Sequence, residues 1–149
     1  MATGHCPVPA THWSSFEHDA ASVPRARRVV RSVLDGAGLD AEATAEIEIV
    51  VSEIVGNSVR HARPLGGGEI HVQCLVVRDG GAHVEIAVTD GGAPGRVVCP
   101  RAVDDGATSG RGLRIVEGLA DEWGVVENLD DLSRTVWASF GGPTRLHPR

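Results

Sequence analysis

Apolar residues recur with the three-to-four-residue period of an α-helix in three stretches of the chain. These stretches are residues 24–35, 40–62 and 112–120. Ser22 is a candidate N-terminal cap for the first stretch, and Gly36 stands where its apolar face ends. The pattern therefore predicts three helices, each with one apolar side to bury against a core.

Shorter apolar runs, bounded by glycine, proline or aspartate, predict five strands. They cover residues 13–18, 69–77, 83–89, 123–127 and 134–140. The second and third runs meet at Asp79-Gly80-Gly81, a sequence typical of a tight hairpin turn. Helices and strands in this order predict an α+β fold, a two-layer sandwich whose antiparallel or mixed sheet is covered on one face by the three helices.

The chain of 149 residues is long enough to bury one core, and we expect a single domain over residues 13–141. Residues 1–12 and 142–149 lack periodicity, so a flexible leader and a flexible tail are expected. Residues 91–110 are also aperiodic and contain five glycines and two prolines. A connection of this length is typical of a disordered segment or of a lid over a ligand.

Composition excludes several classes of protein. No apolar run approaches the roughly 18 residues that span a bilayer, and the start lacks the features of a secretory signal, so we expect a cytoplasmic protein. The formal charge of -6 opposes the basic surface that non-specific binding to nucleic acid requires. The three cysteines, which are odd in number and irregularly spaced, disfavour a disulfide framework and a zinc site.

The basic residues limit the chemistry further, because all 14 are arginine and the chain contains no lysine. A P-loop grip on phosphate and Schiff-base chemistry both depend on a lysine, so the sequence excludes them. Any direct cationic contact with a ligand must come from arginine.

Glu53 and Asn57 form the most informative polar pair. They are four positions apart on a predicted helix, so their side chains lie one above the other near the border of its apolar face. Such a border faces a cleft, where both side chains can converge on one small ligand. A carboxylate can act as a general base, and a carboxamide oxygen is a suitable ligand for Mg²⁺. Taken alone, each residue also fits an exposed helix surface.

Two further features contain glycine. Asp90 ends a strand and precedes Gly91-Gly92, which fits a ligand-binding turn and equally an ordinary Asp-Gly turn. Gly110-Arg111-Gly112 opens a helix, whose N-terminal amides suit a phosphate, and Arg111 can add a charged donor. A plain glycine-rich helix start is the alternative interpretation there.

Four segments of the chain occur in the order of a known pattern. They are SEIVGNSVRHA (52–62), VTDGG (88–92), SGRGLRIVEGLADEWG (109–124) and RTVWASF (134–140). As a set they resemble the ATP-binding core of the GHKL superfamily, which has the Bergerat-type fold. Within that superfamily they are most similar to the bacterial anti-sigma factor serine/threonine kinases.

The resemblance implies a site for ATP and Mg²⁺. Glu53 would be the catalytic base, and Asn57 would bind Mg²⁺ and the nucleotide. Asp90 would accept the exocyclic amino proton of adenine, with Gly92 close to the base and Thr135 helping through Asp90. The other implied nucleotide-binding residues open the last helix: Gly110, Arg111, Gly112 and Leu113.

The resemblance also implies a function. Such a kinase sequesters a sigma factor and phosphorylates an anti-anti-sigma antagonist of the STAS fold, commonly as a homodimer. The alternative is a non-catalytic regulatory module, in which ATP orders residues 91–110 and so presents a protein-binding surface. The presence of both Glu53 and Asn57 favours the active kinase.

Overall fold

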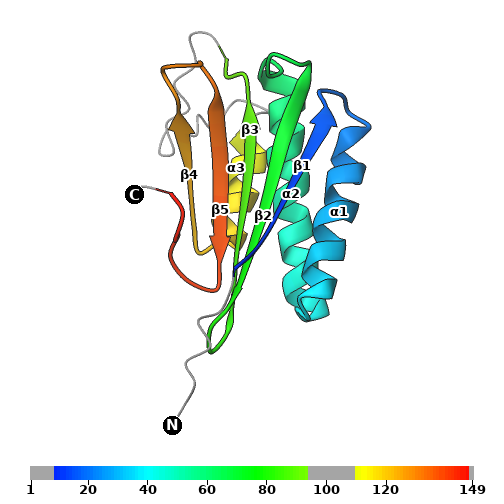
Figure 1. Cartoon of the computed structure of the whole chain (residues 1–149), viewed down its shortest axis with the longest axis vertical. Helices are drawn as coiled ribbons and strands as arrows, with labels where there is room; N and C mark the ends of the chain where they lie inside the picture. The colour runs from blue at the N-terminus through cyan, green and yellow to red at the C-terminus, as the bar shows by residue number, and fades with distance from the viewer. Residues whose placement is uncertain (1–8, 94–109, 148–149) are drawn as a thin grey trace.

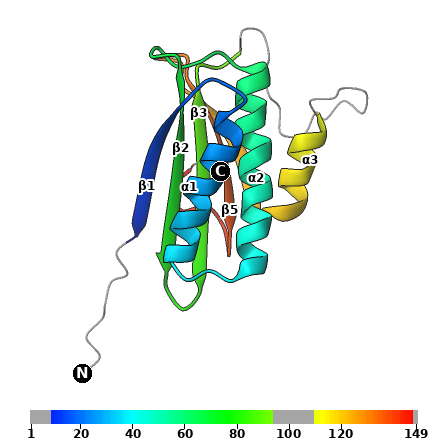
Figure 2. The ribbon, with the colours of Figure 1, turned by 90° about the vertical axis from the view of Figure 1, so that its right-hand side faces the viewer.

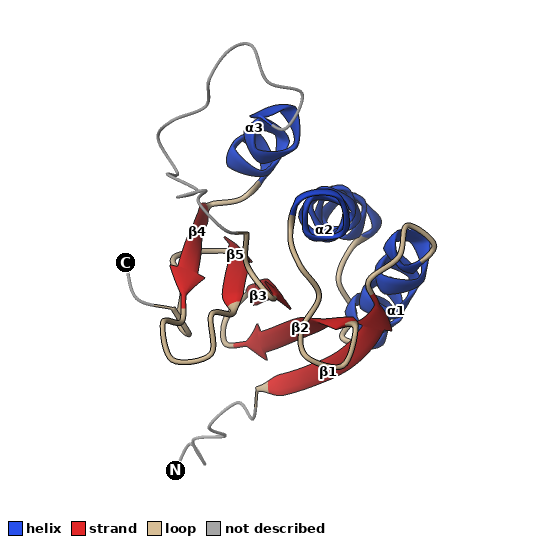
Figure 3. Cartoon of the chain, turned by 90° about the horizontal axis from the view of Figure 1, so that it is seen from above, coloured by secondary structure: helices blue, strands red, loops and turns tan. Residues whose placement is uncertain are grey.

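The computed structural model describes residues 9–93 and 110–147. Residues 1–8, 94–109 and 148–149 lie outside this description, and so do Cys6, Cys99 and most of the expected lid. In the part of the chain that is described, three helices cover one face of a five-stranded sheet (Figures 1 and 3). The predicted α+β sandwich is therefore confirmed.

The helices are α1 (Ser22–Gly36), α2 (Ala41–His61) and α3 (Gly110–Leu119). The strands are β1 (Ala10–Glu17), β2 (Glu69–Arg78), β3 (Ala82–Asp90), β4 (Glu122–Glu127) and β5 (Arg134–Phe140). Strand β1 thus begins within the segment expected to be a flexible leader. The strand order is β1-β2-β3-β5-β4 and each neighbouring pair is antiparallel, which excludes the mixed sheet among the described strands.

The two longer helices begin in different ways. Asp40 caps α2, because its side chain accepts the Ala43 amide at 2.8 Å. Ser22 does not cap α1 as predicted: it is buried inside the first turn, and its hydroxyl donates to the Glu17 carbonyl at 2.7 Å. That hydrogen bond ties α1 to the end of β1 instead.

Of the helices that the structure describes, none is long and apolar enough to cross a membrane.

The core lies between the sheet and the helices, which Figure 2 shows on one side of the strands. Val84, Ile86 and Val88 of β3 point toward the helices and are at most 1% exposed. Burial of each such side chain stabilises the fold by roughly 1.5–3 kcal/mol. This core fixes which way β3 faces, so Asp90, two positions after Val88, also points toward the helices.

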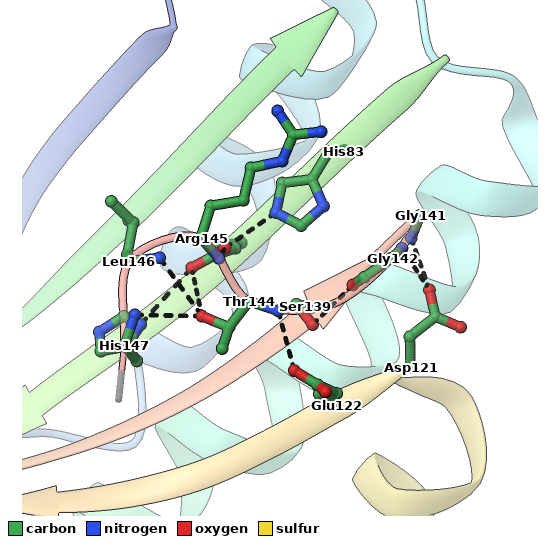
Figure 4. Close-up of polar contacts among 11 residues, drawn as sticks. His83, Asp121, Glu122, Ser139, Gly141, Gly142, Thr144, Arg145, Leu146 and His147 are labelled. Atoms are coloured by element: carbon green, nitrogen blue, oxygen red, sulfur yellow. Dashed lines mark hydrogen bonds and ion pairs between the residues drawn. The ribbon is translucent and has the colours of Figure 1, made fainter. Parts of the chain in front are cut away.

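Residues 142–147 pack against the face of the sheet that carries no helix, around Glu85 of β3 (Figure 4). The Glu85 carboxylate is only 1% exposed and is surrounded by the Thr144 hydroxyl at 3.1 Å, the His83 ring at 2.8 Å and the Arg145 amide. The His147 ring stacks on Trp137 with ring centroids 5.2 Å apart. Where the sequence predicted a flexible tail, the structure therefore has a packed segment as far as His147.

The packed C-terminal segment is expected to lose stability in acid. Burial raises the pKa of Glu85, but hydrogen bonds from Arg145, His83 and Thr144 outweigh it and hold that pKa below its ordinary value. Burial also lowers the pKa of His147, more than the nearby Glu85 carboxylate raises it. The unfolded chain therefore binds more protons than the folded one, so stability falls below pH 6.5 through His147 and below pH 4.5 through Glu85.

Thermal melts of the wild type and of Glu85→Gln, recorded over this pH range, test the prediction. The substitution removes a charged acceptor, so we expect the free energy of unfolding at neutral pH to fall by about 1.5–3 kcal/mol. The loss of stability at the acid end should also become shallower than in the wild type. Glu127→Gln, at an exposed carboxylate of β4, is the control that should leave the pH profile unchanged. A Glu85→Gln protein with the wild-type acid profile would contradict the prediction.

Candidate functional site

Helices α2 and α3 bring Glu53, Asn57 and Gly112 together. Glu53 and Asn57 lie one turn apart on α2 and are both half-buried. A Cβ atom at Gly112 of α3 would lie 2.6 Å from Glu53 Oε2 and 3.6 Å from Asn57 Nδ2. Because glycine has no Cβ atom, Gly112 leaves room for the Glu53 carboxylate. The structure places the two side chains together as expected, while their roles in binding and catalysis stay predictions.

The start of α3 offers suitable electrostatics for an anionic group. Glu53 lies against its first turn, where unpaired backbone amides favour negative charge. Val116, one turn later, is fully buried and anchors α3 on the core. Arg111 is exposed and Leu113 half-buried, so the helix start presents Gly112 to α2 and a cation to solvent. Gly110 is the first residue of the helix, as the glycine pattern predicted.

Arg60 is a cationic neighbour of the site that is absent from the residues predicted from the sequence. Its Nη2 lies 3.5 Å from Asn57 Oδ1, and its guanidinium lies over Gly56, where a Cβ atom would be 2.9 Å from Nη1. The available signal was its spacing of three residues from Asn57, which places both on one helix face. Gly56 thus makes room for an arginine beside Asn57.

Asp90 ends β3 on the helix side of the sheet and has no exposed surface. Its Oδ1 accepts the Gly92 amide at 2.9 Å. Its Oδ2 accepts the Ser58 hydroxyl at 2.6 Å and Nη2 of Arg134 at 3.1 Å. Because Ser58 follows Asn57 on α2, Asp90 ties the end of the sheet to the helix that carries Glu53. No local sequence pattern marks Ser58 or Arg134 as a partner of Asp90.

Thr135 lies on the opposite face of the sheet, which corrects its expected contact with Asp90. In the pairing of β3 with β5, Asp90 stands opposite Arg134, and Thr135 stands opposite Thr89. Successive strand residues point to opposite faces, and the Thr135 hydroxyl lies 2.7 Å from the Thr89 hydroxyl. The β5 residue beside Asp90 is therefore Arg134.

The turn after Asp90 is held tightly against residues 63–64. The Gly91 amide donates to the Arg63 carbonyl, and the Arg63 amide donates to the Gly92 carbonyl, both at 2.8 Å. A Cβ atom at Gly91 would lie 2.2 Å from the Pro64 carbonyl oxygen, and Gly92 has a φ of +71°. Steric room and a left-handed backbone together account for the two glycines.

Gly91→Ala is expected to destabilise the protein, because its methyl group would meet backbone rather than a movable side chain. We expect the free energy of unfolding to fall by about 2–3 kcal/mol, which lowers the melting temperature by roughly 4–12 °C. Gly81→Ala, just before β3, is the matched control, since a Cβ atom there meets nothing within 4 Å. Equal melting temperatures for the two variants in a calorimetric scan would show that the turn is not constrained by Pro64.

The donor set at Glu53 and Asn57 fits Mg²⁺. In the described part of the chain, no group of three or more His, Cys, Asp or Glu could hold a metal ion. Mg²⁺ does not need such a group, because it commonly takes one or two protein oxygens beside phosphate oxygens and water. The carboxylate and the carboxamide are oxygen donors of that kind. Cys74 plays no such part, because it is buried and burial raises the pKa of its thiol to about 12.

The fold and the site together define a class, an α+β sandwich with a carboxylate and a carboxamide at a glycine-opened helix. The model of the histidine kinase-like ATPase domain matches this chain over residues 16–140. The chain belongs to that family, which confirms the resemblance to the GHKL superfamily. Membership in a family of ATPase domains implies that the chain binds ATP.

Solved structures with the same fold include that of the RsbU and RsbW domains of Rv1364c from Mycobacterium tuberculosis. This chain and that structure superpose with a TM-score of 0.65 at 20% sequence identity. The likeness covers 87% of this chain but only 32% of that one, so it establishes the architecture alone. A search of curated protein sequences gives no significant match.

Proposed function

We propose that this chain is an ATP-dependent anti-sigma factor serine/threonine kinase. It sequesters a sigma factor and phosphorylates an anti-anti-sigma antagonist of the STAS fold, in the cytoplasm and as a homodimer. The observation that carries the proposal is the convergence of Glu53 and Asn57 on Gly112 at the start of α3. Membership in the histidine kinase-like ATPase family and the fold shared with a protein that contains an RsbW domain support it.

In the proposed reaction, a hydroxyl oxygen of the antagonist attacks the terminal phosphorus of ATP. The bond from that phosphorus to the bridging oxygen breaks, and ADP leaves. Glu53 accepts the hydroxyl proton, which makes the attacking oxygen more nucleophilic. The Asn57 oxygen would hold Mg²⁺, which would supply positive charge to the phosphates.

Backbone and arginine donors hold the rest of the nucleotide in this proposal. The amides at Gly110 and Gly112 surround the phosphates, with Arg111 as a charged donor and Leu113 beside them. Asp90 accepts the exocyclic amino group of adenine, and the absence of a side chain at Gly92 lets the base approach the backbone. Thr135 has no part in this arrangement, because it lies on the other face of the sheet.

A second candidate function is an ATP-dependent protein-binding module without catalysis. The observation that favours it is the closed state of Asp90, whose carboxylate has three donors and no exposed surface. If a nucleotide displaces one of these donors to reach Asp90, its binding rearranges the protein, which suits a switch between two protein partners.

Calorimetric titration with ATP and Mg²⁺ tests the nucleotide site that both functions share. We expect micromolar binding by the wild type and affinity weaker by about tenfold or more in Asn57→Ala, a loss of at least 1.4 kcal/mol. Gln73→Ala, which removes a half-buried carboxamide from β2, is the matched control and should bind like the wild type. No binding by the wild type would overturn both functions.

A further inference from the structure

Asp90 and Arg134 form a buried ion pair across β3 and β5. Arg134 Nη2 lies 3.1 Å from Asp90 Oδ2, and the side chains are 7% and 0% exposed. Neither residue belongs to the phosphate end of the site at Glu53 and Gly112. Breaking such a pair by removing one partner leaves an uncompensated charge in a low dielectric, so a ligand must supply a substitute if it separates them.

The three donors around Asp90 differ in their freedom to leave. The Ser58 hydroxyl is on a buried residue of α2, and the Gly92 amide is part of a backbone turn fixed by Arg63. The Arg134 guanidinium, by contrast, is at the end of a long side chain. Because Asp90 has no exposed surface, a base can reach its carboxylate only after a donor moves away, and Arg134 is the one able to move.

Space for that movement lies next to the pair. Arg134 lines a cavity of about 180 Å³, together with Arg63, Gly92, Asn128 and Leu132. Its buried Nε atom has no hydrogen-bond partner among the described residues, so the guanidinium is only partly satisfied where it is. Rotation of the Arg134 side chain into the cavity would therefore break its ion pair with Asp90. Among the described residues, the guanidinium has no other hydrogen bond to lose.

We propose that Arg134 is a gating residue, which controls the access of the adenine base to the Asp90 carboxylate. This inference rests on the proposed function. Without nucleotide, the Arg134 guanidinium is paired with the Asp90 carboxylate. A base with an exocyclic amino group replaces it there, and Arg134 moves into the adjoining cavity. The apparent affinity for ATP is then the intrinsic affinity multiplied by the fraction of molecules whose Asp90 is open.

Replacement of Arg134 by an uncharged side chain of similar length tests the gate. In calorimetric titrations of the full chain with ATP and Mg²⁺, Arg134→Met should bind about tenfold more tightly than the wild type, because no internal donor competes. Arg145→Met removes the same charge from an exposed side chain on the helix-free face, and it should bind like the wild type. Equal or weaker binding by Arg134→Met, with normal binding by the wild type, would overturn the gate and leave the proposed function standing.

The wild type offers a second measurement, which holds even if Arg134→Met does not fold. Arginine Nε–H groups give separate signals in nitrogen–hydrogen NMR spectra of labelled protein, and Arg134→Lys identifies the signal of Arg134 by its absence. Saturation with ATP and Mg²⁺ should shift this signal and speed its exchange with water. An unchanged signal at saturation would overturn the gate. Absence of any binding by the wild type would overturn the gate and the proposed function together.

Discussion

Glu53→Gln is expected to abolish phosphoryl transfer while ATP binding changes by less than about twofold. Loss of a positioned general base typically slows such a step by roughly 10²–10⁴-fold. Glutamine keeps the shape of the side chain that lies against Gly112, so the start of α3 should not move. It cannot take up the proton of the attacking hydroxyl, however, and this loss acts on the chemical step alone.

The measurement compares ADP production and phosphate transfer to candidate STAS proteins with the affinity for ATP in the same preparation. Glu46→Gln removes an exposed carboxylate from the same helix and should turn over like the wild type. Equal turnover in Glu53→Gln and the wild type would remove Glu53 from the mechanism. ATP binding without turnover in any variant would instead favour the non-catalytic module.

Asp90→Ala is expected to lower the free energy of unfolding by about 3–5 kcal/mol, in addition to its effect on the affinity for ATP. The substitution removes the acceptor from three donors at once, and one of them is the buried guanidinium of Arg134. Among the described residues, neither the Ser58 hydroxyl nor the Gly92 amide has another acceptor. The end of β3 would then lose its side-chain hydrogen bond to Ser58 of α2, the helix on which Glu53 and Asn57 lie.

Denaturant unfolding monitored by circular dichroism measures this effect. Asp131→Ala is the matched control, because Asp131 also accepts a backbone amide, that of Ser133, but is exposed. We expect it to change the free energy of unfolding by about 1 kcal/mol or less. If Asp90→Ala proved as stable as Asp131→Ala, the ion pair with Arg134 would contribute nothing net to the fold.

Much of this architecture follows from local sequence patterns. Helix α2 could be predicted because its apolar residues keep a regular period over many turns. The hairpin between β2 and β3 could be predicted from glycines at the turn between two apolar runs. Ser22 was misassigned as a cap because its hydroxyl finds a partner in β1, which is not a local feature.

The phase of β5 is where local pattern failed. Val136 and Trp137 are both apolar, so the sequence gives no alternation to show which of them faces the helices. In the structure Val136 joins the core, and Trp137 is covered on the other face by His147 of the C-terminal segment. Because this segment was expected to be flexible, there was no reason to foresee an apolar side chain on the helix-free face.

By itself, the sequence determined the helices, the strands, and the placement of Glu53 and Asn57 on one helix face. These features depend on periods within a single element. Only the tertiary structure decided that Ser58 and Arg134, rather than Thr135, surround Asp90. The physical reason is strand register, since a shift by one residue moves each side chain to the other face, and register is set by packing between elements far apart in the chain.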